Sequence, residues 1–199
     1  LGCEVAFGIY ANSGSIPRVR NQAVAAFLSG GYSDLVFIDS DMGWEPNDLV
    51  RLLSFDVDVV GAAYPARSDE RARWIVVWGD EIKRNGLGLL SAKRVGTGFV
   101  RIRRNVLLKL VELHPELKYS APYASSVDDE WLFALFDYAL KRGVNGVQGH
   151  LSEDYHFCDL VRDAGFDIWV DPNCKMRHVG LKTWSGTFSE AVTVREVDG

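Results

Sequence analysis

The chain has 199 residues, of which 25% are charged and 47% are hydrophobic, and its formal net charge is −5 at pH 7. This length suits one domain with a buried core. The mildly acidic balance argues against sequence-independent nucleic-acid binding, which needs a basic surface. We expect neither a secretory signal nor a membrane span, because no apolar run approaches the ~18 residues that a span needs. The cysteines, Cys3, Cys158 and Cys174, are widely spaced, which favours reduced thiols and a cytoplasmic location.

The first half of the chain alternates between strand and helix patterns. Apolar and β-branched residues predict strands at Glu4–Tyr10, Asp34–Ile38 and Val57–Ala63. Amphipathic spacing predicts a helix at Val19–Leu28, which the Gly30-Gly31 pair ends. A second helix is predicted to have Pro46 in its first turn and to continue through Asp48–Leu53. Such alternation is typical of an α/β domain.

The second half adds a hairpin signal. Apolar runs at Trp74–Trp78 and Leu89–Val95 flank Asn85-Gly86, a dipeptide that favours tight turns between antiparallel strands. Among the later segments, Gly98–Arg103 and Phe166–Val170 are predicted to be strands. Helices are predicted from a capping Asn105 to Leu113 and at Asp154–Ala164. The segment Glu130–Leu140 fits either a helix or a strand. We therefore expect a layered α/β domain with an antiparallel insertion.

Two carboxylates follow the predicted strand Asp34–Ile38. Asp39 and Asp41 are separated by Ser40 at the point where the apolar run ends, and ligands of open α/β sheets bind beyond the carboxyl ends of the strands. Neighbouring carboxylates repel each other unless a cation or hydrogen-bond donors compensate. A divalent cation such as Mg²⁺ or Mn²⁺ suits these hard oxygen ligands. An acidic turn in which Asp41 caps a helix is the simpler alternative.

Further candidates lie near the end of the chain. Glu153 and Asp154 open a predicted helix after Ser152, where acids either complement the helix dipole or serve as a general base. His178 lies in a loop after the strand Phe166–Val170, where it is either structural or able to offer a neutral imidazole to a metal.

The order of these motifs, with Gly96-Thr97-Gly98-Phe99 between them, resembles the GT-A glycosyltransferases, and within them the family-2-like enzymes. The resemblance covers most of the chain, and it rests on the combination rather than on any single motif. It implies a three-layer α/β/α sandwich with a mixed sheet. The best-matching stretches are Ile16–Asn21, Phe37–Asp48, Val59–Pro65 and Ser152–Gly180.

The resemblance also implies roles for individual residues. Asp41 matches the acid that binds Mn²⁺ or Mg²⁺, Asp39 the acid that contacts the donor ribose and supports the metal site, and His178 a histidine that completes the metal and diphosphate site. Asp154 matches the catalytic base of inverting members. The substrates implied are a nucleotide-diphosphate sugar donor and a saccharide or other hydroxyl acceptor. Further substrate contacts are expected from Ser40, Arg20, Arg67, Gly98 and Glu153.

The start of the chain departs from this family. Its members open with a β–α unit that cradles the nucleobase, whereas Glu4–Tyr10 already resembles their second strand. We therefore expect residues 1–199 to form a single, N-terminally shortened catalytic domain. An exposed sheet position at Glu4–Tyr10 is a pairing hazard, which leaves a homo-oligomer open.

Alternative functions remain open at this stage. Haloacid-dehalogenase-like phosphatases also place a DxD motif after an apolar strand, with the first acid as nucleophile, but here Met42-Gly43-Trp44 replaces their usual continuation. Their further lysine and acid pair have no convincing counterpart. A catalytically silent nucleotide-sugar-binding protein is the non-enzymatic alternative.

Overall fold

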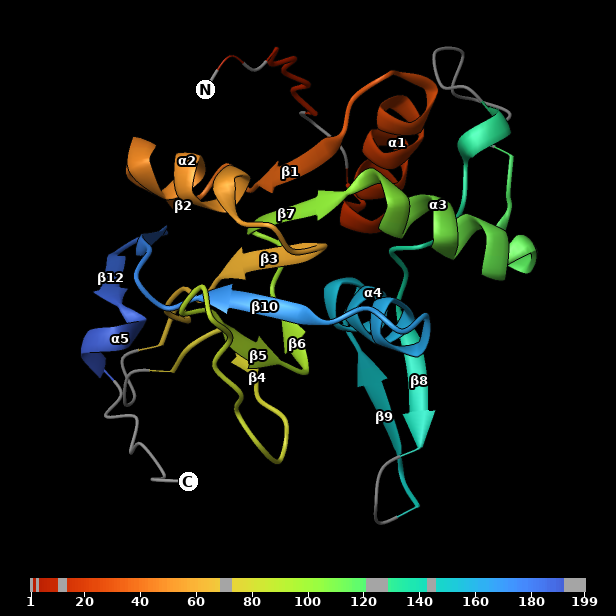
Figure 1. Ribbon diagram of the computed structural model, residues 1–199. Helices are drawn as coiled ribbons and strands as arrows, with labels where there is room; N and C mark the ends of the chain where they lie inside the picture. The colour runs from red at the N-terminus through yellow and green to blue at the C-terminus, as the bar shows by residue number, and fades with distance from the viewer. Residues whose placement is uncertain are drawn as a thin grey trace.

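A five-stranded sheet forms the centre of the protein (Figure 1). The computed structural model describes residues 2, 4–10, 14–68, 73–120, 129–142 and 146–191. In order across the sheet the strands are β1 (Asp34–Ile38), β7 (Phe99–Arg103), β3 (Val59–Ala62), β10 (Ile168–Asp171) and β5 (Leu90–Ala92). Strands β3 and β10 are parallel, and the other neighbours are antiparallel. The predicted α/β class with a mixed sheet is confirmed.

Apolar side chains pack on both faces of this sheet. Adjacent residues of a strand point to opposite faces, and Val59 and Val60 of β3 accordingly belong to different apolar clusters. The larger cluster joins the sheet to α1 (Ile16–Ser29), α3 (Arg104–Leu113) and α4 (Glu153–Asp163). The smaller cluster contains Leu52 of α2 (Pro46–Ser54).

A three-stranded sheet lies beside α2. It joins β2 (Met42–Gly43), β11 (Lys175–Val179) and β12 (Thr183–Thr187) in the order β12-β11-β2. Antiparallel pairs also form between β4 (Val76–Val77) and β6 (Arg94–Val95) and between β8 (Ala139–Arg142) and β9 (Gln148–Leu151). The short helices are η1 (Pro115–Leu117), η2 (Asp129–Trp131) and α5 (Phe188–Ala191).

Arginines around β7 complete the ends of two helices. The last carbonyl groups of a helix lack partners within the helix itself. Arg101 is fully buried and donates to the carbonyl oxygens of Leu52, Phe55 and Val57, at and just beyond the end of α2. Arg104 donates in the same way to carbonyl oxygens at the end of α1. These arginines therefore hold helices to the sheet.

The prediction of a strand at Glu4–Tyr10 is wrong. These residues are described and are in no strand, and Phe7 and Ile9 are 89% and 92% exposed. Strand preference reflects packing against neighbouring strands more than an intrinsic backbone preference. Within the described ranges, nothing pairs with this segment or with the outer edge of β1, so the apolar composition alone does not produce a strand.

Other predictions need smaller corrections. Helix α3 begins at Arg104 with Arg103 as its N-cap residue, so Asn105 lies inside the first turn, where its side chain donates to Asp58 instead of capping. The ambiguous segment Glu130–Leu140 is neither one helix nor one strand, because only its ends fall within η2 and β8.

The turn predicted at Asn85-Gly86 is confirmed, and the flanking runs pair as β4 and β6. The Asn85 side-chain oxygen accepts hydrogen bonds from the amides of Leu87 and Leu89 and so closes the turn. Strand β5, however, joins the central sheet beside β10. The antiparallel insertion is therefore smaller than predicted.

Among the described residues, no helix combines the length and the apolar character needed to cross a bilayer. Cys158 and Cys174 are buried free thiols, and burial raises the pKa of Cys158 to about 12. Cys3 lies outside the described residues.

Candidate functional site

One edge of the central sheet gathers the candidate residues. Strands β1, β3 and β10 run in the same direction and end at this edge, whereas the antiparallel β7 begins there. Asp39 therefore follows β1, Tyr64 lies just beyond β3, and Thr97 lies just before β7. This is the edge where ligands of open α/β sheets bind.

A tight turn presents the two aspartates. The Met42 amide donates to the Asp39 carbonyl oxygen at 3.0 Å, and the Asp39 amide donates to the Gly98 carbonyl oxygen at 2.9 Å. Ser40 lies exposed in this turn. The carboxylates of Asp39 and Asp41 have different partners, because each pairs with a different arginine.

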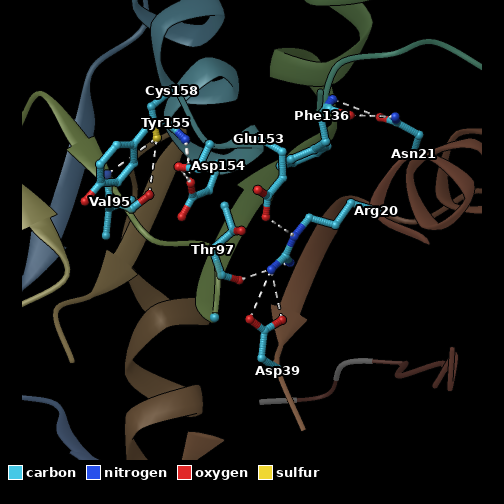
Figure 2. Close-up of polar contacts among 12 residues, drawn as sticks. Arg20, Asn21, Asp39, Val95, Thr97, Phe136, Glu153, Asp154, Tyr155 and Cys158 are labelled. Carbon is cyan, nitrogen blue, oxygen red and sulfur yellow. Dashed lines mark hydrogen bonds and ion pairs between the residues drawn. The ribbon is translucent and has the colours of Figure 1, made fainter. Parts of the chain in front are cut away.

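Arg20 of α1 holds Asp39 (Figure 2). Its Nη2 lies 3.0 Å from both carboxylate oxygens of Asp39, and its Nη1 donates to the Thr97 carbonyl oxygen at 3.4 Å. The guanidinium carbon is 5.2 Å from the centre of the Phe37 ring, a distance at which a cation is attracted to an aromatic face. Arg20 is thus fixed from several sides.

The start of α4 brings Glu153 and Asp154 to the same place. Glu153 is buried, with Oε1 3.8 Å from Arg20 Nε. Burial raises the pKa of Glu153, and the nearby charge of Asp154 raises it further. Asp154 is half-buried, and its Oδ1 accepts from the Ser152 hydroxyl and, at 2.8 Å, from the Tyr155 amide.

Two polar atoms at the base of this cluster are buried without a hydrogen-bond partner in the described part of the chain. They are Arg20 Nε and Thr97 Oγ1. Figure 2 shows Thr97 between Arg20 and Asp154. Buried polar atoms without a hydrogen bond are uncommon in folded proteins, so their presence here sets this cluster apart from the core. The sequence analysis gave Thr97 no role.

Tyr64 lies beneath the glycines that precede β7. Its hydroxyl oxygen accepts a hydrogen bond from the Gly98 amide at 3.3 Å. A Cβ at Gly96 would lie 2.3 Å from this oxygen, and a Cβ at Gly98 would lie 2.9 Å from it, so both positions require glycine. Burial, with the charges of Asp39 and Asp154, raises the pKa of Tyr64 and keeps its hydroxyl protonated.

Sequence reasoning also missed Tyr64. The signal was nevertheless available, because a residue with a polar group just beyond a predicted buried strand lies at the same sheet edge as Asp39.

Asp41 and His178 meet across the small sheet. His178 pairs with Met42 in the β2–β11 register, and the Val179 amide donates to the Asp41 carbonyl oxygen at 2.8 Å. His178 Nε2 consequently lies 3.6 Å from Asp41 Oδ2. The Arg67 guanidinium contacts this same oxygen.

The protonation of the His178 ring follows from its second contact. Its Nδ1 is 2.9 Å from the Pro65 carbonyl oxygen, which can only accept a hydrogen bond, so this contact assigns the proton to Nδ1. In the neutral ring Nε2 then presents a lone pair toward the Asp41 carboxylate. Metal-binding histidines commonly have this arrangement, with the distal nitrogen held by a carbonyl group.

The predicted metal ligands are only partly brought together. Asp41 and His178 adjoin each other, but both oxygens of Asp39 contact Arg20. In the described ranges, no three His, Cys, Asp or Glu side chains form a group that could hold a metal. The Asp41 carboxylate is the type of ligand that Mg²⁺ or Mn²⁺ takes with phosphate oxygens and water, whereas the His178 imidazole suits a transition metal better than Mg²⁺.

Comparison with known proteins bears on the fold alone. The crystal structure of A197 from STIV is similar, with a TM-score of 0.51 and 16% sequence identity, over 94% of this chain and 82% of that chain. No family model matches the sequence, and no curated protein matches it.

The structure places every predicted site residue at or near this sheet edge. Asp39, Arg20 and Glu153 form a group around the buried Arg20 side chain, which Asp154 adjoins, and Asp41, Arg67 and His178 form a second group around the partly exposed Arg67 side chain. Gly98 joins Asp39 to Tyr64, because its carbonyl oxygen accepts from the Asp39 amide and its own amide donates to the Tyr64 hydroxyl, and the Tyr64 ring lies edge-on to His178 at 5.4 Å between ring centres. The chemical roles of these residues stay predictions.

Proposed function

We propose that this chain is a glycosyltransferase of the GT-A type, with a three-layer α/β/α sandwich, that transfers a sugar from a nucleotide-diphosphate donor to an acceptor hydroxyl. The observation that carries the proposal is the convergence of separate segments on one sheet edge. Asp41, beside His178 and Arg67, would face the diphosphate, while Asp154 would face the acceptor.

The donor end would combine a cation with an arginine. Asp41 and His178 would hold Mn²⁺ or Mg²⁺, which when bound neutralises charge on the departing diphosphate. Arg67 would bind phosphate oxygens, because its planar guanidinium suits bidentate contact with them. Arg20 would act indirectly, since it fixes Asp39 and hence the turn that presents Asp41.

The acceptor end would supply the base. An acceptor hydroxyl becomes an effective nucleophile when a carboxylate takes its proton. Ser152 and the Tyr155 amide hold Asp154 Oδ1 and so orient the carboxylate. Burial, with the charge of Asp154, raises the pKa of neighbouring Glu153, and the Glu153 carboxyl group faces Arg20 Nε at 3.8 Å. We expect inversion at the anomeric carbon.

The phosphatase alternative fits the geometry less well. It requires Asp39 as the nucleophile, but both carboxylate oxygens accept hydrogen bonds from Arg20, which reduces their nucleophilicity. A catalytically silent protein would bind the nucleotide sugar through the same residues, Asp41, His178 and Arg67, but would transfer no sugar to an acceptor.

Thermal unfolding with a panel of nucleoside diphosphates tests the donor end. A ligand present at 100 times its Kd stabilises the folded state by about 2.7 kcal/mol. We expect one base to raise the Tm more with Mn²⁺ than without it, and Asp41→Asn to lose the Mn²⁺-dependent part. The exposed Asp80→Asn is a control with the same charge change. The proposal fails if no nucleotide raises the Tm, or if Asp41→Asn keeps the full response.

A further inference from the structure

Two side chains, Arg67 and His178, lie beside Oδ2 of Asp41, the oxygen that a bound cation would contact. The Arg67 guanidinium contacts it directly, and His178 Nε2 lies 3.6 Å away. Asp41 and Arg67 are each more than a third exposed at the side chain, so solutes can reach the pair. A dissolved cation or anion can therefore replace one partner of the Asp41–Arg67 ion pair.

His178 is arranged for a positive partner other than Arg67. Its Nδ1 lies against the Pro65 carbonyl oxygen, so in the neutral ring Nε2 would be an acceptor facing the Asp41 carboxylate. Two acceptors at this separation repel each other unless a cation or a proton lies between them. Arg67 neutralises Asp41 from one side, but a metal ion could bind both atoms at once.

The Arg67 side chain is 43% exposed, so part of it already faces solvent. Arg67 belongs to the turn after β3 in which the Ser68 amide donates to the Ala66 carbonyl oxygen at 2.8 Å. Its side chain lies along Gly180, where a Cβ would come within 3.5 Å of Arg67 Cδ and Nε. A partly exposed ion pair of this kind contributes only about 0–1 kcal/mol, so the contact between Arg67 and Asp41 can break at little cost.

We infer that Arg67 and a divalent cation compete for Asp41, and that the arriving cation transfers Arg67 from Asp41 to the diphosphate of the donor. Like charges on one carboxylate oxygen repel each other strongly at such short range, so the cation and the guanidinium exclude each other there. The displaced guanidinium then meets the nearest new negative charge, which is the diphosphate. This inference rests on the proposed function for the identity of the anion.

Binding of Mn²⁺ alone, followed by electron paramagnetic resonance of the free ion, tests the competition. Arg67→Gln should bind Mn²⁺ about two- to fivefold more tightly than the wild type, the range expected when a partly exposed ion pair no longer competes. Asp41→Asn should lose the site in either background. Arg84→Gln, which removes the same charge at an exposed position, should leave Mn²⁺ affinity unchanged.

The second measurement uses the best nucleoside diphosphate at saturating Mn²⁺. Here Arg67→Gln should bind the nucleotide about tenfold more weakly, because a charged hydrogen-bond donor to phosphate is lost. Opposite changes in the two measurements support the inference. Equal or weaker Mn²⁺ binding by Arg67→Gln overturns the competition, and unchanged nucleotide affinity overturns the transfer to the diphosphate. A wild type that binds Mn²⁺ as described but binds no nucleotide contradicts the proposed function and leaves the competition standing.

Discussion

Asp39 and Asp41 lie on one turn and each pairs with an arginine, yet the two pairs differ in burial. The Arg20 side chain is 7% exposed and holds both oxygens of Asp39, whereas the Arg67 side chain is 43% exposed and shares one oxygen of Asp41 with His178. The two carboxylates themselves are similarly exposed, at 40% for Asp39 and 36% for Asp41, so the difference lies in the burial of the arginines and in how many carboxylate oxygens each arginine holds. The spacing of the two acids does not reveal this difference.

Substitution of Asp154 should have the largest effect on activity, because Asp154 lies near the Arg20–Asp39 pair but would itself act on the substrate. General-base assistance is worth about 10²–10⁴ in rate. Asp154→Asn should lower turnover of a nucleotide-sugar donor by about that factor, while Mn²⁺-dependent nucleotide affinity stays close to that of the wild type. Release of nucleoside diphosphate under saturating donor measures the turnover. Near-normal turnover, or a product that keeps the donor's anomeric configuration, contradicts the assignment.

The Arg20–Asp39 pair should contribute more stability than the Arg67–Asp41 pair, because the Arg20 side chain is buried. Arg20→Gln leaves Asp39 without its partner, and breaking a buried ion pair costs about 3–5 kcal/mol. Because Asp39 is partly exposed and can be rehydrated, we expect a loss of about 2–3 kcal/mol. Arg67→Gln should lose less than about 1 kcal/mol. Urea unfolding measures both, and equal losses would remove the distinction between the pairs.

Tyr64, whose hydroxyl accepts from the Gly98 amide, provides a test of how tightly the sheet edge beneath Asp39 is packed. Gly96→Ala would place a Cβ 2.6 Å from Ile75 Cγ2 as well as against the Tyr64 hydroxyl. Overpacking of this kind costs about 1–3 kcal/mol. The matched control is Gly31→Ala, whose Cβ would meet nothing within 4 Å and should leave the urea midpoint nearly unchanged.

Glu153 gives the smallest expected effect, and it depends on pH. Its pKa is raised in the folded state, first by burial and then by Asp154, so ionisation of Glu153 favours the unfolded state. The free energy of unfolding of the wild type should therefore fall as pH rises from the ordinary glutamate pKa through the raised one. Glu153→Gln lacks this decline. Its Tm relative to the wild type should increase between pH 4 and pH 7, and a constant difference would refute the buried-carboxyl description.

Local patterns predicted the centre of the fold. The apolar run at Asp34–Ile38 is β1 with the same bounds, and α4 starts one residue before the predicted Asp154, after Ser152. These elements carry their own signals, either β-branched runs or a capping residue followed by acids. The Glu4–Tyr10 segment has such a run but lacks a paired strand among the described residues, which shows that composition without a partner is not sufficient.

The candidate site depended more on long-range contacts. The sequence indicated Asp41 and His178 as separate candidates, and their proximity arises from the pairing of β2 with β11, which leaves no local signal. It likewise could not show that Arg20 would occupy Asp39, because that contact depends on how α1 packs against β1 and β7. Thr97 was missed because its unpaired hydroxyl is a property of the packed structure.

A crystal structure with Mn²⁺ and the best nucleoside diphosphate tests the central claim most directly. We predict that the cation contacts Asp41 and His178, that the diphosphate lies between this cation and Arg67, and that Arg20 keeps its hydrogen bonds to Asp39. Nucleotide bound away from this sheet edge, or a complex in which Arg67 still holds Asp41 while Arg20 has released Asp39, would contradict the account.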